Sequence, residues 1–255
     1  MSSRKIRRKY GQNYLKDPAI LFDMGDVISP QEFDNFIEIG PGLGALTNQI
    51  NKKNINIIAI DVDTKNIEFL KNKFQKPANF VFKNKDILKY EIEEDNVNHR
   101  IVGNLPYNIS TQIILKLVDD VEKIKDMHFL VQKEVAQKIT GKVASKNWGK
   151  LAIKIAAFFN SEILFDVPPD AFDIKPKVNS SFIRMLPKKG QDYGLEIKEE
   201  LYKTIDLAFS SRRKNIKNNL KSLKINWDSL NIDPKKRPEE ISLNHFIKIT
   251  QDQKN

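Results

Sequence analysis

The chain has 255 residues, of which 40% are hydrophobic, enough to bury one large domain or a large domain and a small one. It contains no cysteine, which excludes disulfides and thiolate chemistry, and it lacks an apolar run of about 18 residues, so a soluble, cytoplasmic protein is expected. The formal charge of +10 indicates a polyanionic partner, and the spacing of His99, His128 and His245 does not suggest a metal site.

Short apolar runs alternate with helical patterns over the first two thirds of the chain. We predict buried strands at residues 36–39, 55–60, 79–82, 100–102 and 127–131, with helices at 43–52, 63–74, 110–118 and 133–139. This alternation favours an α/β fold with a mostly parallel, Rossmann-like sheet. Two further runs, 162–167 and 181–186, flank a proline-rich loop and are expected to form an antiparallel pair at the sheet edge.

Beyond residue 187 the sequence shows only helical patterns. They cover residues 198–209, 211–223 and 242–249. We therefore predict a large domain at 1–187, which carries a basic N-terminal arm, and a small all-helical domain at 188–255.

Positive charge is concentrated in two short segments. The N-terminal one includes Arg7, Arg8 and Lys9, and the C-terminal one spans 210–224 without a carboxylate. Helical spacing would bring most cations of the second segment to one helix face. A solvated face is the alternative, but acids are normally interleaved there, so phosphate contact is favoured. The residues expected to bind RNA are Arg7, Arg8, Lys9, Arg212, Arg213, Lys214, Lys217 and Lys221.

Three glycines at alternate positions follow the first predicted strand, in the run Glu38-Ile39-Gly40-Pro41-Gly42-Leu43-Gly44. Without Cβ atoms, the backbone of Gly40 and Gly42 can approach a ligand closely. A dinucleotide site prefers the spacing G-x-G-x-x-G, whereas G-x-G-x-G after an acid is similar to an S-adenosylmethionine turn. Glu38 would then face the cationic methionine end of this cofactor. The alternative is a tight strand-to-helix connection.

Acidic side chains also close the second and third predicted strands. Asp61 is placed to accept the two ribose hydroxyls of the cofactor, and Asp86 to accept its adenine amino group. The alternative is that such aspartates cap helices, as Asp63 is expected to do.

The sequence Asn104-Leu105-Pro106-Tyr107 follows the fourth predicted strand. Methylation of an aromatic amine requires acceptors that draw its hydrogens out of the ring plane. The Asn104 amide oxygen and the Leu105 carbonyl supply two, Pro106 fixes their geometry and Tyr107 can stack on the base. The alternative is an ordinary strand end that runs into a proline turn.

Several of these motifs together resemble the bacterial small-subunit ribosomal RNA adenine dimethyltransferases. The resemblance spans nearly the whole chain and is carried by residues 9–15, 38–47, 104–110, 127–135, 167–169 with Phe172, 176–178 and 212–214. It implies the transfer of two methyl groups to N6 of each of two adjacent adenosines in a hairpin loop near the 3′ end of 16S rRNA. The expected partner is this RNA within a small subunit or its precursor, bound by a monomer that needs neither metal nor membrane.

The resemblance also implies site roles. Residues 11–15 are expected to form a lid over the cofactor; the alternative is an N-terminal helix cap in which Tyr14 and Leu15 only pack. Phe172 is expected to sandwich the target base with Tyr107. The cofactor site is expected to contain Gln12, Asn13, Leu15, Glu38, Gly40, Gly42, Asp61, Asp86 and Asn104. The chain departs from the family pattern at Asp61, where relatives often carry Glu, and at Asn179, where they often carry Asp.

Three other functions remain as alternatives. A methyltransferase of large-subunit (23S) rRNA that confers antibiotic resistance is the nearest, but residues 132–134 and 212–214 favour the small-subunit enzyme. A noncatalytic RNA-binding or ribosome-assembly factor differs in class, and the intact motifs argue against it. A dehydrogenase is the weakest alternative.

Overall fold

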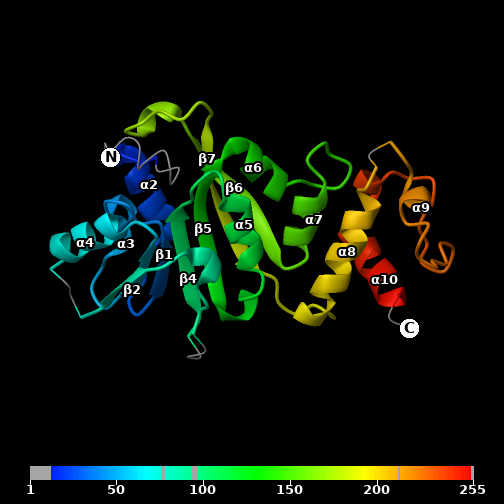
Figure 1. Ribbon diagram of the computed structural model, residues 1–255, viewed down its shortest axis with the longest axis horizontal. Helices are drawn as coiled ribbons and strands as arrows, with labels where there is room; N and C mark the ends of the chain where they lie inside the picture. The colour runs from blue at the N-terminus through cyan, green and yellow to red at the C-terminus, as the bar shows by residue number, and fades with distance from the viewer. Residues whose placement is uncertain (1–12, 76–77, 94–96, 212, 254–255) are drawn as a thin grey trace. The chain divides into compact units, whose positions relative to one another are not determined.

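The computed structural model of the chain (Figure 1) describes residues 13–75, 78–93, 97–211 and 213–253. Internal contacts divide the chain into two units, Met1–Ala136 with Glu162–Pro187, and Gln137–Ser161 with Lys188–Asn255. One junction follows Pro187, where the sequence predicts a domain boundary. The segment Gln137–Ser161, which the prediction places in the first domain, groups with the C-terminal helices.

A seven-stranded sheet has the order β3-β2-β1-β4-β5-β7-β6. Pairing is parallel from β3 through to β5 and antiparallel between β5 and β7, which confirms the mostly parallel, Rossmann-like sheet. The strands are β1 (Asn35–Ile39), β2 (Asn56–Asp61), β3 (Phe80–Asn84), β4 (His99–Asn104), β5 (Ile124–Gln132), β6 (Phe159–Val167) and β7 (Ser180–Pro187).

Parallel register brings the ends of β1, β2 and β4 together. Ile39 pairs with Ile60, and Asn104 pairs with Leu130 of β5. At Gly103 the two strands, β4 and β1, leave no room for a side chain, because a Cβ atom would lie 2.5 Å from the Ile39 carbonyl oxygen. The glycine turn, Asp61 and Asn104 therefore meet at one edge of the sheet.

The first unit contains the helices α2 (Pro18–Ile28), α3 (Ala45–Ile50), α4 (Thr64–Lys73) and α5 (Ser110–Lys116), and α6 (Lys133–Ile139) follows β5. The sequence analysis did not predict α2. Its N-cap is Asp17, whose carboxylate accepts hydrogen bonds from the backbone N–H groups of Ala19 and Ile20, and Pro18 occupies the first helical position.

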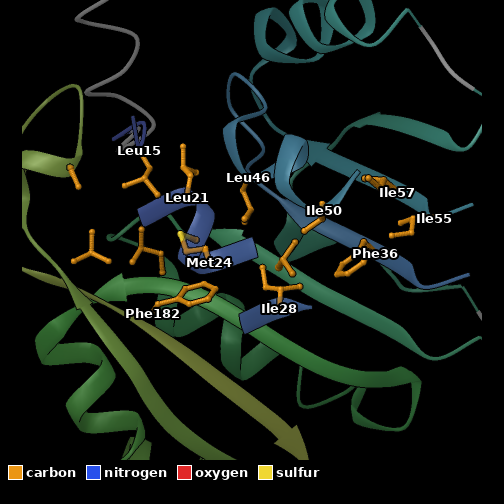
Figure 2. Packing of buried hydrophobic residues seen from close by; sticks show 14 of the residues in the cluster. Leu15, Leu21, Met24, Ile28, Phe36, Leu46, Ile50, Ile55, Ile57 and Phe182 are labelled. Carbon is orange, nitrogen blue, oxygen red and sulfur yellow. The ribbon is translucent and has the colours of Figure 1, made fainter. Parts of the chain in front are cut away.

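The core of the first unit lies between α2 and the sheet. Figure 2 shows Met24 and Ile28 of α2 packed with Phe36, Ile50 and Phe182, which come from β1, α3 and β7. All five side chains are essentially inaccessible to solvent. Burial of this apolar surface fixes α2 against the strands that precede the site.

The second unit contains α7 (Lys150–Ala156), α8 (Lys198–Ala208), α9 (Ile216–Asn219) and α10 (Leu243–Asp252). The helices predicted at 198–209 and 242–249 are confirmed by α8 and α10. The sequence analysis did not predict α7.

The helix predicted at 211–223 is wrong, because α9 has only four residues. The backbone N–H groups of Ile216 and Lys217 donate to the carbonyls of Lys236 and Pro234 instead of to a preceding turn, and Asn215 caps the short helix. The cations of this segment therefore do not share a single helical face.

No helix in the described ranges is both long and apolar enough to cross a membrane.

Candidate active site

A cavity opens at the carboxyl ends of β1, β2 and β4, with about 700 Å³ of space that is partly open to solvent. Its wall brings together nine of the predicted site residues: Asn13, Gly40, Gly42, Asp61, Asp86, Asn104, Leu105, Pro106 and Tyr107. Residues from four strand ends, those of β1 to β4, and from the N-terminal segment thus line one cavity, as a site at the edge of a doubly wound sheet requires.

The glycine turn has a backbone conformation that residues with a side chain rarely adopt. Gly40 and Gly42 have φ angles of +64° and +56°, in the left-handed region. A Cβ atom on Gly42 would also lie 2.7 Å from the Tyr14 ring. The backbone N–H of Gly40 donates to the Ile60 carbonyl at 2.9 Å, which ties the turn to β2.

Asp61 is held by a chain of hydrogen bonds that reaches Tyr14. One carboxylate oxygen accepts from the Asp63 backbone N–H at 2.8 Å and the other from the Asn66 side-chain amide at 2.8 Å. The Tyr14 hydroxyl donates to the side-chain oxygen Oδ1 of Asn66 at 3.1 Å. Burial raises the pKa of Asp61, although these hydrogen bonds oppose the rise. A further hydrogen bond, from the Gly42 backbone, also opposes the rise.

The sequence analysis missed Asn66 and gave Tyr14 no role beyond packing in the lid segment, but both line the cavity. The available signal was weak: Asn66 is a buried polar residue beside Ile67 on the apolar face of α4.

Asp86 lies on the cavity wall and also caps a short helix. Its carboxylate accepts from the Leu88 backbone N–H at 3.0 Å, at the start of the 3-10 helix Ile87–Lys89. Asp63 caps α4 in the same way, as expected. The capping alternative therefore holds for Asp86, which still faces the cavity.

Glu38 lies in an adjoining cavity, which shares Tyr14, Gly40 and Asn104 with the first and is also lined by Leu15. The carboxyl group is 1% exposed and accepts a hydrogen bond from the Thr47 hydroxyl at 2.6 Å. Burial raises its pKa to about 7, with a smaller contribution from the charge of Asp61. A cation in this cavity would favour the ionised form of Glu38.

The raised pKa of Glu38 predicts a pH-dependent effect of Glu38→Gln on folding. Between pH 4.5 and about 7 the folded state holds a proton that the unfolded state releases, so the wild type loses stability as the pH rises. The shift corresponds to about 3 kcal/mol. Urea unfolding should show Glu38→Gln gaining stability over wild type from pH 5 to pH 8, and the exposed control Glu68→Gln should show no such trend. A pH-independent difference for Glu38→Gln would contradict the assignment.

The Asn104 amide is oriented by the N-terminal segment. Its Nδ2 donates to the Asn13 carbonyl at 2.8 Å, and among the described residues nothing donates to its Oδ1. The backbone N–H of Leu105 donates to the Leu130 carbonyl at 3.1 Å, which fixes the next residue to β5. The amide therefore has an acceptor to offer at the cavity wall.

Tyr107 is anchored by Ser180, a residue that the sequence analysis did not single out. The two hydroxyl oxygens are 2.6 Å apart, and Ser180 is completely buried at the start of β7. Burial raises the pKa of Tyr107 and the hydrogen bond from Ser180 opposes the rise. The phenol thus stays neutral, with its ring held at the cavity.

Phe172 does not lie on the cavity wall. Its side chain is 0% exposed and packs in the hydrophobic cluster with Leu15, Ala171 and Phe182. An isolated antiparallel bridge joins its backbone to Leu15. The expected pairing of Phe172 with Tyr107 across a base is therefore not formed here, because the ring is part of the core.

Several predicted residues lie elsewhere. Gln12, Arg7, Arg8, Lys9 and Arg212 are outside the described residues. The cations Arg213, Lys214, Lys217 and Lys221 are exposed in the second unit. Asn179 is also exposed, and its carbonyl accepts from the Lys133 backbone N–H at 2.9 Å. In the described part of the chain, His, Asp and Glu side chains form no group of three that could hold a metal ion.

Solved structures show the same fold. The crystal structure of the 23S rRNA methyltransferase ErmE aligns with a TM-score of 0.75 at 20% identity, covering 95% of this chain and 100% of that one. A dimethyladenosine transferase from Plasmodium falciparum aligns with a TM-score of 0.79 at 23% identity, covering 93% and 96%. The fold is therefore that of the Rossmann-like methyltransferases.

The family model for ribosomal RNA adenine dimethylase matches residues 3–251. A protein of Neisseria gonorrhoeae named ribosomal RNA small subunit methyltransferase A is 36% identical over 252 residues, which cover 98% of this chain and 97% of that protein. A protein of the same name from Coxiella burnetii is 36% identical over 255 residues, 98% of each. The chain belongs to the ribosomal RNA adenine dimethylase family.

Proposed function

We propose that the chain transfers methyl groups from S-adenosylmethionine to N6 of two adjacent adenosines in the 3′-terminal hairpin loop of 16S rRNA. It acts in the cytoplasm, as a monomer and without a metal ion, on a small subunit or its precursor. The observation that carries this proposal is the Asn104 amide, whose Nδ2 is bound to Asn13 while its Oδ1 remains available beside the glycine turn. The two relatives named for the small subunit support the choice of RNA.

The cavity residues fit the cofactor by their chemistry. The Asp61 carboxylate is an acceptor for the ribose hydroxyls, and Asp86 offers an acceptor for the adenine amino group. The backbone of Gly40 and Gly42 leaves room that side chains would fill, and Asn13, Leu15 and Glu38 surround the amino acid end. We also assign Gln12 to the cofactor site, as part of the lid expected at residues 11–15.

The cofactor supplies a methyl group that its sulfonium has already activated. The Asn104 side-chain oxygen and the Leu105 carbonyl accept hydrogen bonds from the N6 amino group and turn the nitrogen lone pair out of the base plane. As the nitrogen attacks, it becomes positively charged, and the same two oxygens stabilise that charge. Water then takes the released proton.

Tyr107 stacks on the target adenine, and Ser180 fixes the ring. Extruding a base costs a few kcal/mol, while stacking on an aromatic ring returns about 1 to 3 kcal/mol. A loop adenosine, which is already partly unstacked, is therefore the suitable substrate.

Tyr107→Ala is expected to lower kcat/KM on limiting RNA about 10- to 100-fold, because it removes the stacking surface. Tyr107→Phe keeps the ring but loses the bond to Ser180, so it should retain most of the activity. Methyl incorporation into small-subunit RNA measures both variants. Wild-type rates for Tyr107→Ala would contradict the stacking role.

Phe172→Ala tests whether Phe172 contributes to stacking in spite of its burial. A purely structural Phe172 should show lower stability, by about 3 to 5 kcal/mol, with kcat/KM close to wild type at a temperature where the variant is folded. A stacking Phe172 should reduce kcat/KM to the same extent as Tyr107→Ala in the folded variant. Urea unfolding and methyl incorporation together separate the two results.

Mass spectrometry of nucleosides tests the function itself. Small and large ribosomal subunits that lack the modification are incubated separately with protein and cofactor. N6,N6-dimethyladenosine in 16S rRNA alone is expected. Its appearance in 23S rRNA alone would favour the resistance-type enzyme, and its absence from both would favour the noncatalytic assembly factor.

A further inference from the structure

The second unit contains a cavity of its own, distinct from the methyl-transfer cavity. It has about 1010 Å³ of space, much of it open to solvent, and is lined by residues 145–152 together with Lys138, Phe209 and Glu239. All of these residues belong to the second unit. Three of the lining side chains are lysines, Lys138, Lys146 and Lys150, and only one is a carboxylate.

The loop that forms this cavity has a fixed shape. The Trp148 indole N–H donates to the Ile241 carbonyl at 2.8 Å, and its ring is only 6% exposed. Backbone N–H groups of Ala144 and Ser145 donate to the carbonyls of Glu239 and Lys142, each at 3.0 Å. The polar side chains on the loop are therefore presented on a constrained backbone.

Two donors on this loop have no partner among the described residues. The Ser145 hydroxyl oxygen is buried and forms no hydrogen bond there. Lys146 is exposed and forms no ion pair with a described carboxylate. In contrast, the Lys150 ammonium forms an ion pair with Asp206 at 3.3 Å. A buried hydroxyl without a partner is unfavourable, and a ligand rich in acceptors would supply the missing hydrogen bond.

We propose that this cavity binds a backbone phosphate of the RNA substrate. A phosphodiester offers only acceptor oxygens and a negative charge, which match the Ser145 hydroxyl and the ammonium groups of Lys146 and Lys138. The identification of the polyanion as RNA rests on the proposed function. The contact adds affinity without reading sequence, and it gives the second unit a binding residue outside the predicted cations at 212–221.

Lys146→Ala tests the charge, and Lys142→Ala is its matched control. Lys142 is an exposed lysine on the same loop that does not line the cavity. The full chain is titrated with 16S rRNA at several salt concentrations. Lys146→Ala should weaken binding several-fold and reduce the slope of log K against log salt by about 0.7 to 0.9, the contribution of one phosphate contact. Equal behaviour of the two variants would overturn the proposal.

Ser145→Ala separates binding from folding. A hydroxyl without a partner in the free protein adds nothing to stability, so the variant should be as stable as wild type or more so in urea unfolding. Its affinity for 16S rRNA should nevertheless fall. Unchanged affinity would overturn the role of Ser145.

Two further arms identify the ligand. Adenosine monophosphate is titrated in parallel against wild type and Lys146→Ala. If Lys146→Ala weakens the binding of adenosine monophosphate but not that of 16S rRNA, the ligand is a free nucleotide and the proposal is overturned. Wild-type methylation of small subunits is measured with the same preparation. If wild type forms dimethyladenosine while Lys146→Ala and Lys142→Ala bind 16S rRNA equally well, this site is rejected and the proposed function stands.

Discussion

Asn104→Ala is expected to abolish methyl transfer while leaving RNA binding largely intact. The variant loses the oxygen that accepts an N6 hydrogen and stabilises the developing charge, and removal of one such preorganised group typically lowers kcat by about 100- to 1,000-fold. It also loses the hydrogen bond from Nδ2 to the Asn13 carbonyl, so cofactor affinity should fall as well. Single-turnover methyl incorporation into small subunits, with both substrates saturating, measures the chemical step.

Two variants control for this result. Asn108→Ala removes an exposed amide four residues further on, which does not line the cavity, and should retain wild-type turnover. Asn104→Asp keeps an acceptor but has no N–H to donate to Asn13, so it tests whether orientation of the side chain is required. Unchanged turnover in Asn104→Ala would reject the assigned role of the amide.

Arg100→Met is expected to destabilise the fold by about 3 to 5 kcal/mol. The guanidinium, 6% exposed, pairs with the carboxylates of Asp34 at 2.6 Å and Asp126 at 2.9 Å. It also donates to the carbonyls of Ile28 and Ser29 at the end of α2. Methionine fills a similar volume but removes the cation between two buried carboxylates, so Asp126 loses its guanidinium partner and Asp34 keeps only the Lys125 ammonium. Urea unfolding at neutral pH measures the loss.

Arg184→Met is the matched control for Arg100→Met. Arg184 pairs with Glu162 at the surface, where its side chain is 39% exposed, so the loss should be at most about 1 kcal/mol. Equal losses in the two variants would contradict the importance of burial.

The acid stability of the Arg100 cluster follows from Asp34. Burial by itself would raise the pKa of this carboxyl, but hydrogen bonds from Lys125, the Gln31 backbone and Arg100 outweigh it and lower the pKa. The stabilisation is therefore complete above the ordinary value of 3.8 and is lost as the pH falls below it.

The sequence predicts the sheet well because its strands are apolar runs with clear breaks. The runs at 36–39, 55–60 and 100–102 correspond to β1, β2 and β4, and their ends carry the glycine turn, Asp61 and Asn104. Parallel strands place such ends at one edge, so sequence order alone brings these groups together.

The short helix α9 shows where periodicity fails. Ile216, Leu220 and Leu223 recur at helical spacing, but backbone donors from this segment bind carbonyls of Lys236 and Pro234, some twenty residues away. Only tertiary structure supplies those acceptors. In contrast, α2 had a local signal in Asp17 and Pro18, which are a helix cap and a first-turn proline.

Within the site, motif residues could be predicted but their supports could not. Asn104 and Tyr107 stand out by their spacing. Asn13 was expected only as a cofactor-site residue, not as the partner of Asn104, and Ser180, the partner of Tyr107, was not expected at all. The burial of Phe172 likewise depends on Leu15 and Phe182, which no local pattern connects to it.

The hydrogen bond from Leu105 to Leu130 has a consequence for heat inactivation. It continues the pairing of β4 with β5 one residue beyond Asn104, so the first half of the reactive tetrapeptide is tied to the central ladder. Displacement of Asn104 and Leu105 therefore requires the end of this ladder to open. Catalytic competence and the global unfolding transition should consequently share one temperature.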